Sequence, residues 1–189
     1  MNYKINNFNQ RKKDILSKPD KSSIGKWDEK IIPLCNKINQ NKNYYTTSSC
    51  SGRIVLMIDS EKKSSGLFLY ISHNLITLKT LKQELKKIKK TNLIKFKQEP
   101  MILHVACASL EHAKKLLDKS RKAGFKKIGI ISLGKNIIVE INGSQKIEFP
   151  IMKNKKILVN DDFLKLIIQK SNKNLKKTWD KIKKLEKSF

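Results

Sequence analysis

The stretch Tyr44–Ile54 reads YYTTSSCSGRI and is the most informative part of this chain. Tyrosine and threonine in its first half favour a β-strand, because aromatic and β-branched side chains suit a pleated, half-buried surface. The Ser-Cys-Ser-Gly end favours a turn, in which Gly52 lets the backbone pass close to a ligand. Arg53 then precedes an apolar run that predicts the next strand. Small polar side chains beside a guanidinium can present several donors to one carboxylate or phosphate. A Ser/Thr-rich hairpin turn without a ligand is the alternative.

The charge of the chain is extreme. Among 189 residues, 42 are Lys or Arg and 16 are Asp or Glu, which gives a formal net charge of +26. Such a surface attracts polyanions such as RNA, with an affinity that falls steeply as salt rises. Only three of the basic residues are Arg, and Asn and Ile are abundant, so part of the charge reflects the codon usage of an A/T-rich genome. Against this lysine background, Arg53 indicates a use for the planar guanidinium fork.

Several classes of protein are disfavoured by composition. No apolar run reaches 18 residues and no signal-peptide pattern is present, which predicts a cytoplasmic protein that does not enter a membrane. The cysteines, Cys35, Cys50 and Cys107, are odd in number and widely spaced, and therefore fit neither a disulfide framework nor a Cys-x-x-Cys metal site. No His, Asp and Glu cluster at ligand spacing, so we expect no metal, and a metal-dependent RNA-processing hydrolase is disfavoured.

The order of predicted elements indicates the fold class. Helices are expected at 3–16, 28–41, 80–90, 110–123 and about 161–187, and strands at 44–49, 54–58, 67–72, 93–96, 102–107, 127–131, 137–141, 146–149 and 157–159. Strands and helices without strict alternation predict an α+β fold, a single domain over residues 1–189 with a mixed, largely antiparallel sheet packed with helices. No Gly-x-Gly-x-x-Gly is present, so a Rossmann-type nucleotide site lacks its usual signal. Gly129–Asn136 differs from a P-loop at Asn136 and predicts a hairpin turn.

The run Tyr44–Ile54 resembles the signature of the tRNA wybutosine-synthesizing protein 3 family. Further blocks resemble the family pattern in the same order: Asp20–Ser22, Gly25–Asp28, Ile32–Leu34, Leu67–His73, Phe96, Glu99–Pro100, Ile102–Val105, Ala123–Lys126 and Gly129–Ile130. One departure is the pair Lys97-Gln98, which stands between Phe96 and Glu99 where the family reads Phe-Glu-Pro. The resemblance extends from about residue 3 to the C-terminus.

The resemblance implies an S-adenosylmethionine-dependent N-methyltransferase of wybutosine biosynthesis. The implied partner is tRNA(Phe) that carries a 4-demethylwyosine-type base next to the anticodon. The implied cofactor, S-adenosylmethionine, would lie in a pocket unlike the Rossmann type. A non-catalytic basic RNA-binding module is the alternative, since the charge alone would serve it. The oligomeric state does not follow from the sequence.

The matching blocks also supply candidate site residues. For binding of substrate or cofactor they are Asp20, Ser22, Ser48, Ser49, Cys50, Ser51, Gly52, Arg53 and Glu99. We take His73 and His104 as candidate catalytic residues, because a nitrogen acceptor must lose a proton to a group that titrates near working pH. We expect Arg53 to hold a carboxylate or phosphate. Methyl transfer needs no covalent intermediate, so we expect Cys50 to form part of the pocket wall rather than to act as a nucleophile.

Strand and helix geometry limits what other residues can do. Neighbouring positions of a strand face opposite ways, so at most one of Tyr44 and Tyr45 is expected to stack on a base, with the other in the core. The same alternation separates His104 from Cys107 and argues against joint metal binding. His112 is expected in the first turn of a helix, exposed to solvent. The C-terminal helix combines an apolar stripe for core packing with lysines for weak contacts to RNA phosphates.

Overall fold

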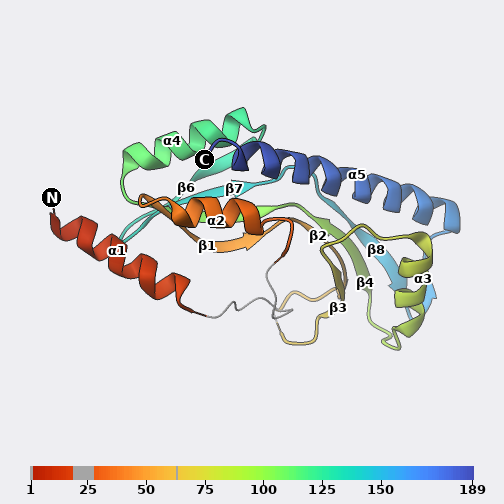
Figure 1. Cartoon of the computed structure of the whole chain (residues 1–189). Coiled ribbons are helices and arrows are strands. Elements are labelled where there is room, and N and C mark those ends of the chain that lie inside the picture. Colours follow the sequence, from red (N-terminus) through yellow and green to blue (C-terminus); the bar gives the residue numbers. More distant parts are fainter. Residues whose placement is uncertain (1, 19–27, 63) are drawn as a thin grey trace. The chain divides into compact units, whose positions relative to one another are not determined.

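The computed structural model describes residues 2–18, 28–62 and 64–189, which form five helices and nine strands (Figure 1). The strands lie in two sheets whose pairs are antiparallel, so the α+β class and the antiparallel character of the predicted sheet are confirmed. The chain forms two compact units. The first comprises Met1–Ser51, Met101–Ser144 and Trp179–Phe189, and the second comprises Gly52–Pro100 and Gln145–Thr178. A single domain over residues 1–189 stays a prediction.

The first unit contains a four-stranded sheet in the order β1-β5-β7-β6. Its strands are β1 (Tyr44–Cys50), β5 (Ile102–Cys107), β7 (Ile137–Asn142) and β6 (Lys127–Leu133). Its helices are α1 (Asn2–Leu16), α2 (Ile32–Gln40), α4 (Leu110–Lys122) and the end of α5 (Asp161–Glu186). Leu103 and Val105 of β5 belong to a buried core formed with α2, α4 and α5. On the opposite face, Phe8 of α1 packs on Tyr45, with the ring centroids 5.1 Å apart. Side chains of β5 that alternate with the core residues therefore point to this second face.

The second unit contains a five-stranded sheet in the order β3-β2-β4-β8-β9. Its strands are β3 (Phe68–Ser72), β2 (Arg53–Ile58), β4 (Ile94–Glu99), β8 (Ile147–Lys153) and β9 (Lys156–Ile157), and its helices are α3 (Leu78–Lys87) and the first part of α5. Ile54 and Leu56 of β2, together with Ile94 and Phe96 of β4, are fully buried. Lys95, Lys97 and Glu99 occupy the alternate positions of β4, so their side chains lie on the other face of the sheet.

Capping residues define both ends of α4, which was predicted at 110–123. Ser109 accepts a hydrogen bond from the backbone N–H of His112, as an N-cap of α4 should. Gly124 follows the helix with φ of +95°, a conformation that favours glycine. The predicted stripe of α5 is also confirmed, since Leu164, Ile168, Leu175, Ile182 and Leu185 are buried, as are three polar residues among them, Ser171, Asn174 and Thr178.

Several predicted boundaries were wrong, among them the end of β4 at Glu99 rather than 96 and the end of α3 at Lys87 rather than 90. Helix α2 begins at Ile32 rather than Asp28, because the Asp28 carboxylate accepts hydrogen bonds from the backbone N–H groups of Lys30 and Ser51. Strand β8 continues through Pro150 to Lys153 instead of ending at Phe149. Pro150 pairs with Lys95 next to a shift in register between β4 and β8, a place where a residue without a backbone N–H is tolerated.

A buried polar pair joins α5 to the second sheet. Asn174 donates to the side-chain oxygen of Gln98 at 2.8 Å, and the Gln98 amide donates to the carbonyls of Glu99 and Gln145. Asn174→Ala should lower the free energy of unfolding by about 1–3 kcal/mol, because it leaves the buried Gln98 oxygen without a donor. Denaturant unfolding measures the change. Asn92→Ala, at an exposed position, is the control and should change stability by less than about 0.5 kcal/mol. Equal stabilities of the two variants would contradict the prediction.

Candidate functional site

The stretch Tyr44–Ile54 passes from one unit into the other. Strand β1 ends at Cys50 in the first unit, and β2 begins at Arg53 in the second. Gly52 has φ of +98°, a conformation that favours glycine, but Ser51 and Gly52 form no hydrogen-bonded turn, so the predicted turn was wrong. The two strands are not a hairpin, because β1 pairs with β5 and β2 pairs with β3 and β4. The Ser51 N–H donates to the Asp28 carboxylate at 2.7 Å, which fixes the backbone where β1 ends. Ser51 and Gly52 are therefore a connection between the strands of two sheets.

In the first unit, polar side chains form a row across three strands. Ser48 of β1 lies opposite His104 of β5, which lies opposite Glu140 of β7. The His104 Nε2 and Glu140 Oε2 atoms are 2.8 Å apart, and the two side chains are 25% and 32% exposed. This row occupies the face that holds the Phe8–Tyr45 contact, opposite the apolar core. The histidine is thus held by a carboxylate yet remains accessible from solvent.

The His104–Glu140 pair has a defined chemical capacity. A carboxylate oxygen accepts hydrogen bonds, so Nε2 supplies the proton in a contact with neutral His104, and Nδ1 then carries the lone pair. Such an imidazole can take a proton from a bound group while the carboxylate fixes the ring orientation. Glu140 was not predicted as a site residue. Its signal is visible in the sequence, since it is the one charge within the apolar strand IIVEI at 137–141.

The remaining predicted residues of β1 point in different directions. Ser49 forms a side-chain hydrogen bond with Cys35 of α2, on the core side of the sheet. Burial raises the pKa of the Cys35 thiol to about 11, and the Ser49 contact opposes that shift. Cys50 is half-buried, and Ser51 is fully buried, with no hydrogen-bond partner for its Oγ among the described residues. Ser51 Oγ is therefore a buried polar atom of the signature stretch that no described residue satisfies.

Cys50→Ser should keep kcat for group transfer within a few-fold of the wild-type value, because we expect the thiol to shape the site and not to attack. Of the other thiols, burial raises the pKa of Cys107 to about 12, and that of Cys35 is raised as well, so neither is a thiolate near neutral pH. Steady-state kinetics of the purified variant measures the effect. A loss of about 1,000-fold or more, with unchanged thermal unfolding, would assign Cys50 a covalent role instead.

In the second unit, Arg53 is held from two sides. Its Nε donates to Glu99 Oε2 at 2.6 Å, and its guanidinium carbon lies 5.1 Å from the centroid of the Phe68 ring. Glu99 also lies 3.5 Å from Lys97. Among the residues that the structure describes, none accepts a hydrogen bond from the terminal nitrogens of Arg53. The side chain is 24% exposed, so a fixed guanidinium presents donors to a small anion.

The two inserted residues leave Glu99 on the face that pairing with Arg53 requires. Lys97 and Gln98 both lie within β4, and an insertion of two preserves the alternation of a strand. Phe96 and Gln98 therefore point to the core, while Glu99 lies opposite Arg53 in the antiparallel register.

Other predicted residues have varied outcomes. His73 follows β3 in the second unit and is half-buried, whereas His104 belongs to the first unit. Asp20 and Ser22 lie outside the described residues. At most one of Tyr44 and Tyr45 was expected to stack on a base with the other in the core, and both are buried, at 4% and 0% exposure. His112 was expected to be exposed, but it is half-buried against Tyr44, with ring centroids 5.9 Å apart.

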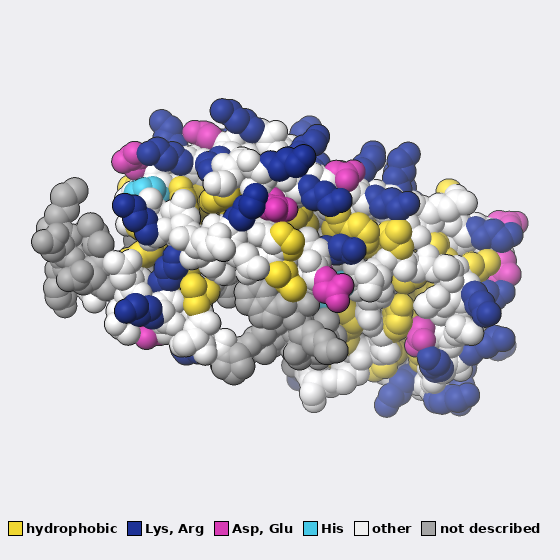
Figure 2. Space-filling view, in the orientation of Figure 1, with side chains coloured by type: hydrophobic (Ala, Val, Ile, Leu, Met, Phe, Trp, Pro, Cys, Tyr) yellow, Lys and Arg dark blue, Asp and Glu magenta, His cyan; other side chains and the backbone are white. Residues whose placement is uncertain are grey.

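The surface agrees with the basic composition. Figure 2 shows Lys and Arg side chains spread widely over the visible face, with few Asp and Glu between them. Among the described residues, no helix combines the length and apolar character that a membrane span requires.

Comparisons with known proteins identify the family of this chain. The family described as methyltransferase TYW3 matches residues 10–189. A Methanocaldococcus jannaschii protein named tRNA(Phe) 7-((3-amino-3-carboxypropyl)-4-demethylwyosine(37)-N(4))-methyltransferase is 40% identical over 154 residues, which are 79% of each chain. A Thermococcus sibiricus protein with the same name is 35% identical over 180 residues, covering 94% of this chain and 91% of its own.

A solved structure is similar to this chain over nearly its whole length. The PH1069 protein from Pyrococcus horikoshii superposes with a TM-score of 0.86 at 33% identity, covering 97% of this chain and 94% of its own. The match therefore includes both units and the stretch that connects them. The chain belongs to the methyltransferase TYW3 family.

Proposed function

We propose that this protein transfers a methyl group from S-adenosylmethionine to a ring nitrogen of a wyosine-type base in tRNA(Phe). The acceptor is the base that names the relatives, 7-(3-amino-3-carboxypropyl)-4-demethylwyosine at position 37, and the nitrogen is N4. The reaction belongs to wybutosine biosynthesis and takes place in the cytoplasm. The observation that carries the proposal is the part-exposed His104–Glu140 pair, at 2.8 Å, in which His104 lies opposite Ser48 of the signature stretch.

His104 acts as the base or orients it. The acceptor nitrogen loses a proton during methylation, and a positioned imidazole can receive it. Glu140 holds Nε2, so Nδ1 is the atom that would accept this proton. Ser48, opposite His104 on β1, adds a hydroxyl for contact with the bound base. The row therefore supplies both an orientation and a proton acceptor at one face of a rigid sheet.

Arg53 fits the amino-acid end of a reactant. Its terminal nitrogens meet no acceptor among the described residues, while Glu99 and Phe68 fix the guanidinium plane. A planar fork of this kind recognises a carboxylate through two parallel hydrogen bonds. S-adenosylmethionine carries one carboxylate, and the 3-amino-3-carboxypropyl group of the acceptor carries another. When bound, S-adenosylmethionine supplies the electrophilic methyl group, and the chain supplies alignment.

A labelled-methyl assay tests this function. The purified protein is mixed with S-adenosylmethionine labelled in the methyl group and with tRNA(Phe) from cells that accumulate the precursor base. We expect label in the tRNA, and none in tRNA(Phe) whose position 37 is guanine. No transfer to the precursor tRNA would exclude the enzyme.

A non-catalytic RNA-binding module is the second candidate, and the net charge of +26 favours it. It predicts tRNA binding without transfer, and equal binding of precursor and unmodified tRNA. Label transfer in the same assay excludes it, because a binding module does not catalyse methyl transfer.

A further inference from the structure

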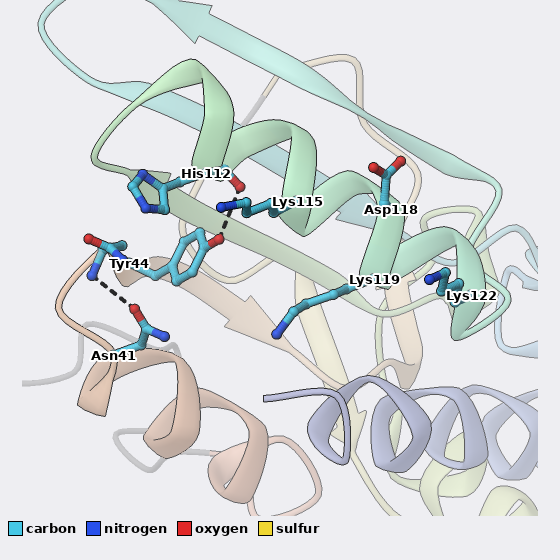
Figure 3. Close-up of a pocket in the computed structure, with 8 residues that line it drawn as sticks. Asn41, Tyr44, His112, Lys115, Asp118, Lys119 and Lys122 are labelled. Carbon is cyan, nitrogen blue, oxygen red and sulfur yellow. Dashed lines mark hydrogen bonds between the residues drawn. The ribbon is translucent and has the colours of Figure 1, made fainter.

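A basic cleft lies in the first unit, away from the His104–Glu140 row. It has a volume of about 410 Å³ and is lined by Asn41, Asn43, Tyr44, His112, Lys115, Asp118, Lys119 and Lys122. One wall is α4 and the other is the connection between α2 and β1, as Figure 3 shows. The four cationic or imidazole residues recur at intervals of three or four along α4, so they share one side of the helix.

The walls of the cleft are fixed by internal contacts. The Tyr44 hydroxyl donates to the His112 carbonyl at 3.0 Å, and the Tyr44 ring makes edge contacts with His112 and Phe189. The Asn43 N–H donates to Asn41 Oδ1 at 2.9 Å, and the Asn41 carbonyl accepts from Lys12 at 2.6 Å. These bonds hold the cleft open without using the lysine ammonium groups of α4.

The charge inside the cleft is positive. Among the described residues that line it, Asp118 is the one carboxylate, and it lies 3.0 Å from the Arg121 guanidinium. Lys115 forms an exposed ion pair with Glu111. Replacing Glu111 by another anion at this lysine costs little free energy. Lys119 donates to the Ser188 carbonyl and lies 4.2 Å from the centroid of the Phe189 ring. Among the described residues, none forms an ion pair or hydrogen bond with Lys122.

The spacing suits a chain of phosphates better than a single one. Lys115 and Lys122 are separated by about 10 Å along the helix axis, from the rise per residue. One phosphate group does not bridge that length, whereas successive phosphodiesters of a nucleic acid strand do. Lysine binds phosphate as a point charge and needs no base contact, so such a cleft positions RNA without reading its sequence.

We propose that the α4 cleft binds phosphodiester groups of the RNA backbone and anchors the tRNA on the first unit. The inference rests on the proposed function for the identity of the RNA. It goes beyond that function because it assigns Lys115, Lys119 and Lys122, which no matching block contains, to substrate binding.

The test compares two double variants with equal loss of charge. Lys115→Gln with Lys122→Gln removes two cations of the cleft. Lys79→Gln with Lys86→Gln removes two exposed lysines of α3 in the second unit, at the same spacing of seven residues. The measurement is the Kd for tRNA(Phe) as a function of KCl concentration. Each lost phosphate contact lowers the slope of log K against log salt by about 0.7–0.9. We expect a decrease of about 1.4–1.8 for the cleft variant and little change for the control.

Three results would overturn the inference. One is an unchanged slope in the cleft variant with unchanged thermal unfolding. The second is an equal change in both double variants, which would indicate diffuse attraction by the whole surface. The third is saturable binding of tripolyphosphate that the cleft variant loses while it keeps its tRNA slope, which would assign the cleft to a free polyphosphate.

Kinetics separate this inference from the proposed function. With precursor tRNA, the cleft variant should raise KM and leave kcat unchanged, because backbone contacts bind substrate and transition state equally. If the wild-type protein transfers no methyl group, the enzyme proposal fails, while the difference in salt slope between the two double variants still decides the cleft.

Discussion

His104→Gln should lower kcat for methyl transfer by roughly 100- to 10,000-fold, the contribution that a positioned base makes. Glutamine keeps an N–H that can donate to Glu140, but its amide nitrogen is not basic, so the variant removes the base and retains the contact. KM for tRNA should change little, since the loss appears mainly in the transition state. Single-turnover rates with labelled S-adenosylmethionine measure the effect.

Two controls separate the base from a structural role of His104. Thermal unfolding of His104→Gln should match that of the wild-type protein, because the side chain is part-exposed and its hydrogen bond is kept. Added imidazole should restore part of the activity of His104→Ala, since a small base can enter the vacated space. A decrease of less than about three-fold in His104→Gln would remove His104 from the chemistry.

Arg53→Ala should raise one KM by roughly 10- to 150-fold, which corresponds to the loss of a charge-assisted hydrogen bond of about 1.5–3 kcal/mol. The KM that rises identifies the ligand. A rise for tRNA alone means that Arg53 holds the carboxylate of the 3-amino-3-carboxypropyl group. A rise for S-adenosylmethionine alone means that it holds the methionine carboxylate.

Matched variants sharpen the Arg53 measurement. Arg53→Lys keeps the charge without the planar fork and should recover only part of the affinity. Lys97→Gln removes one positive charge from the same side of β4, next to Glu99, and should leave both KM values within about two-fold. Unchanged KM values in Arg53→Ala, or an equal rise in Lys97→Gln, would contradict the proposed contact.

Local signals were sufficient to predict most elements. The N-cap at Ser109 and the glycine at position 124 define α4 to within a residue, because each satisfies a requirement of the backbone itself. The hairpin turn near Gly134 was also predicted, since Lys127–Leu133 and Ile137–Asn142 pair as β6 and β7. Polar turns and apolar alternation act over a few residues, and the sequence displays them directly.

Long-range pairing could not be predicted from the same signals. Strands β1 and β2 are adjacent in sequence, yet β1 pairs with β5, and this decides which residues face His104. Glu140 meets His104 across 36 residues of chain, a contact that depends on the register of β5 with β7. Tyr45 is buried because Phe8 of α1 covers it, and strand alternation alone does not show that cover.

The most direct test is to locate the transferred methyl group. Precursor tRNA(Phe) is incubated with the protein and S-adenosylmethionine, digested to nucleosides and examined by tandem mass spectrometry with a reference standard. We predict one added methyl group on N4 of the nucleoside from position 37, present with the wild-type protein and strongly reduced with His104→Gln. A methyl group at another atom or another nucleotide would contradict the proposed function. So would the absence of any added methyl group when folded wild-type protein is bound to the tRNA.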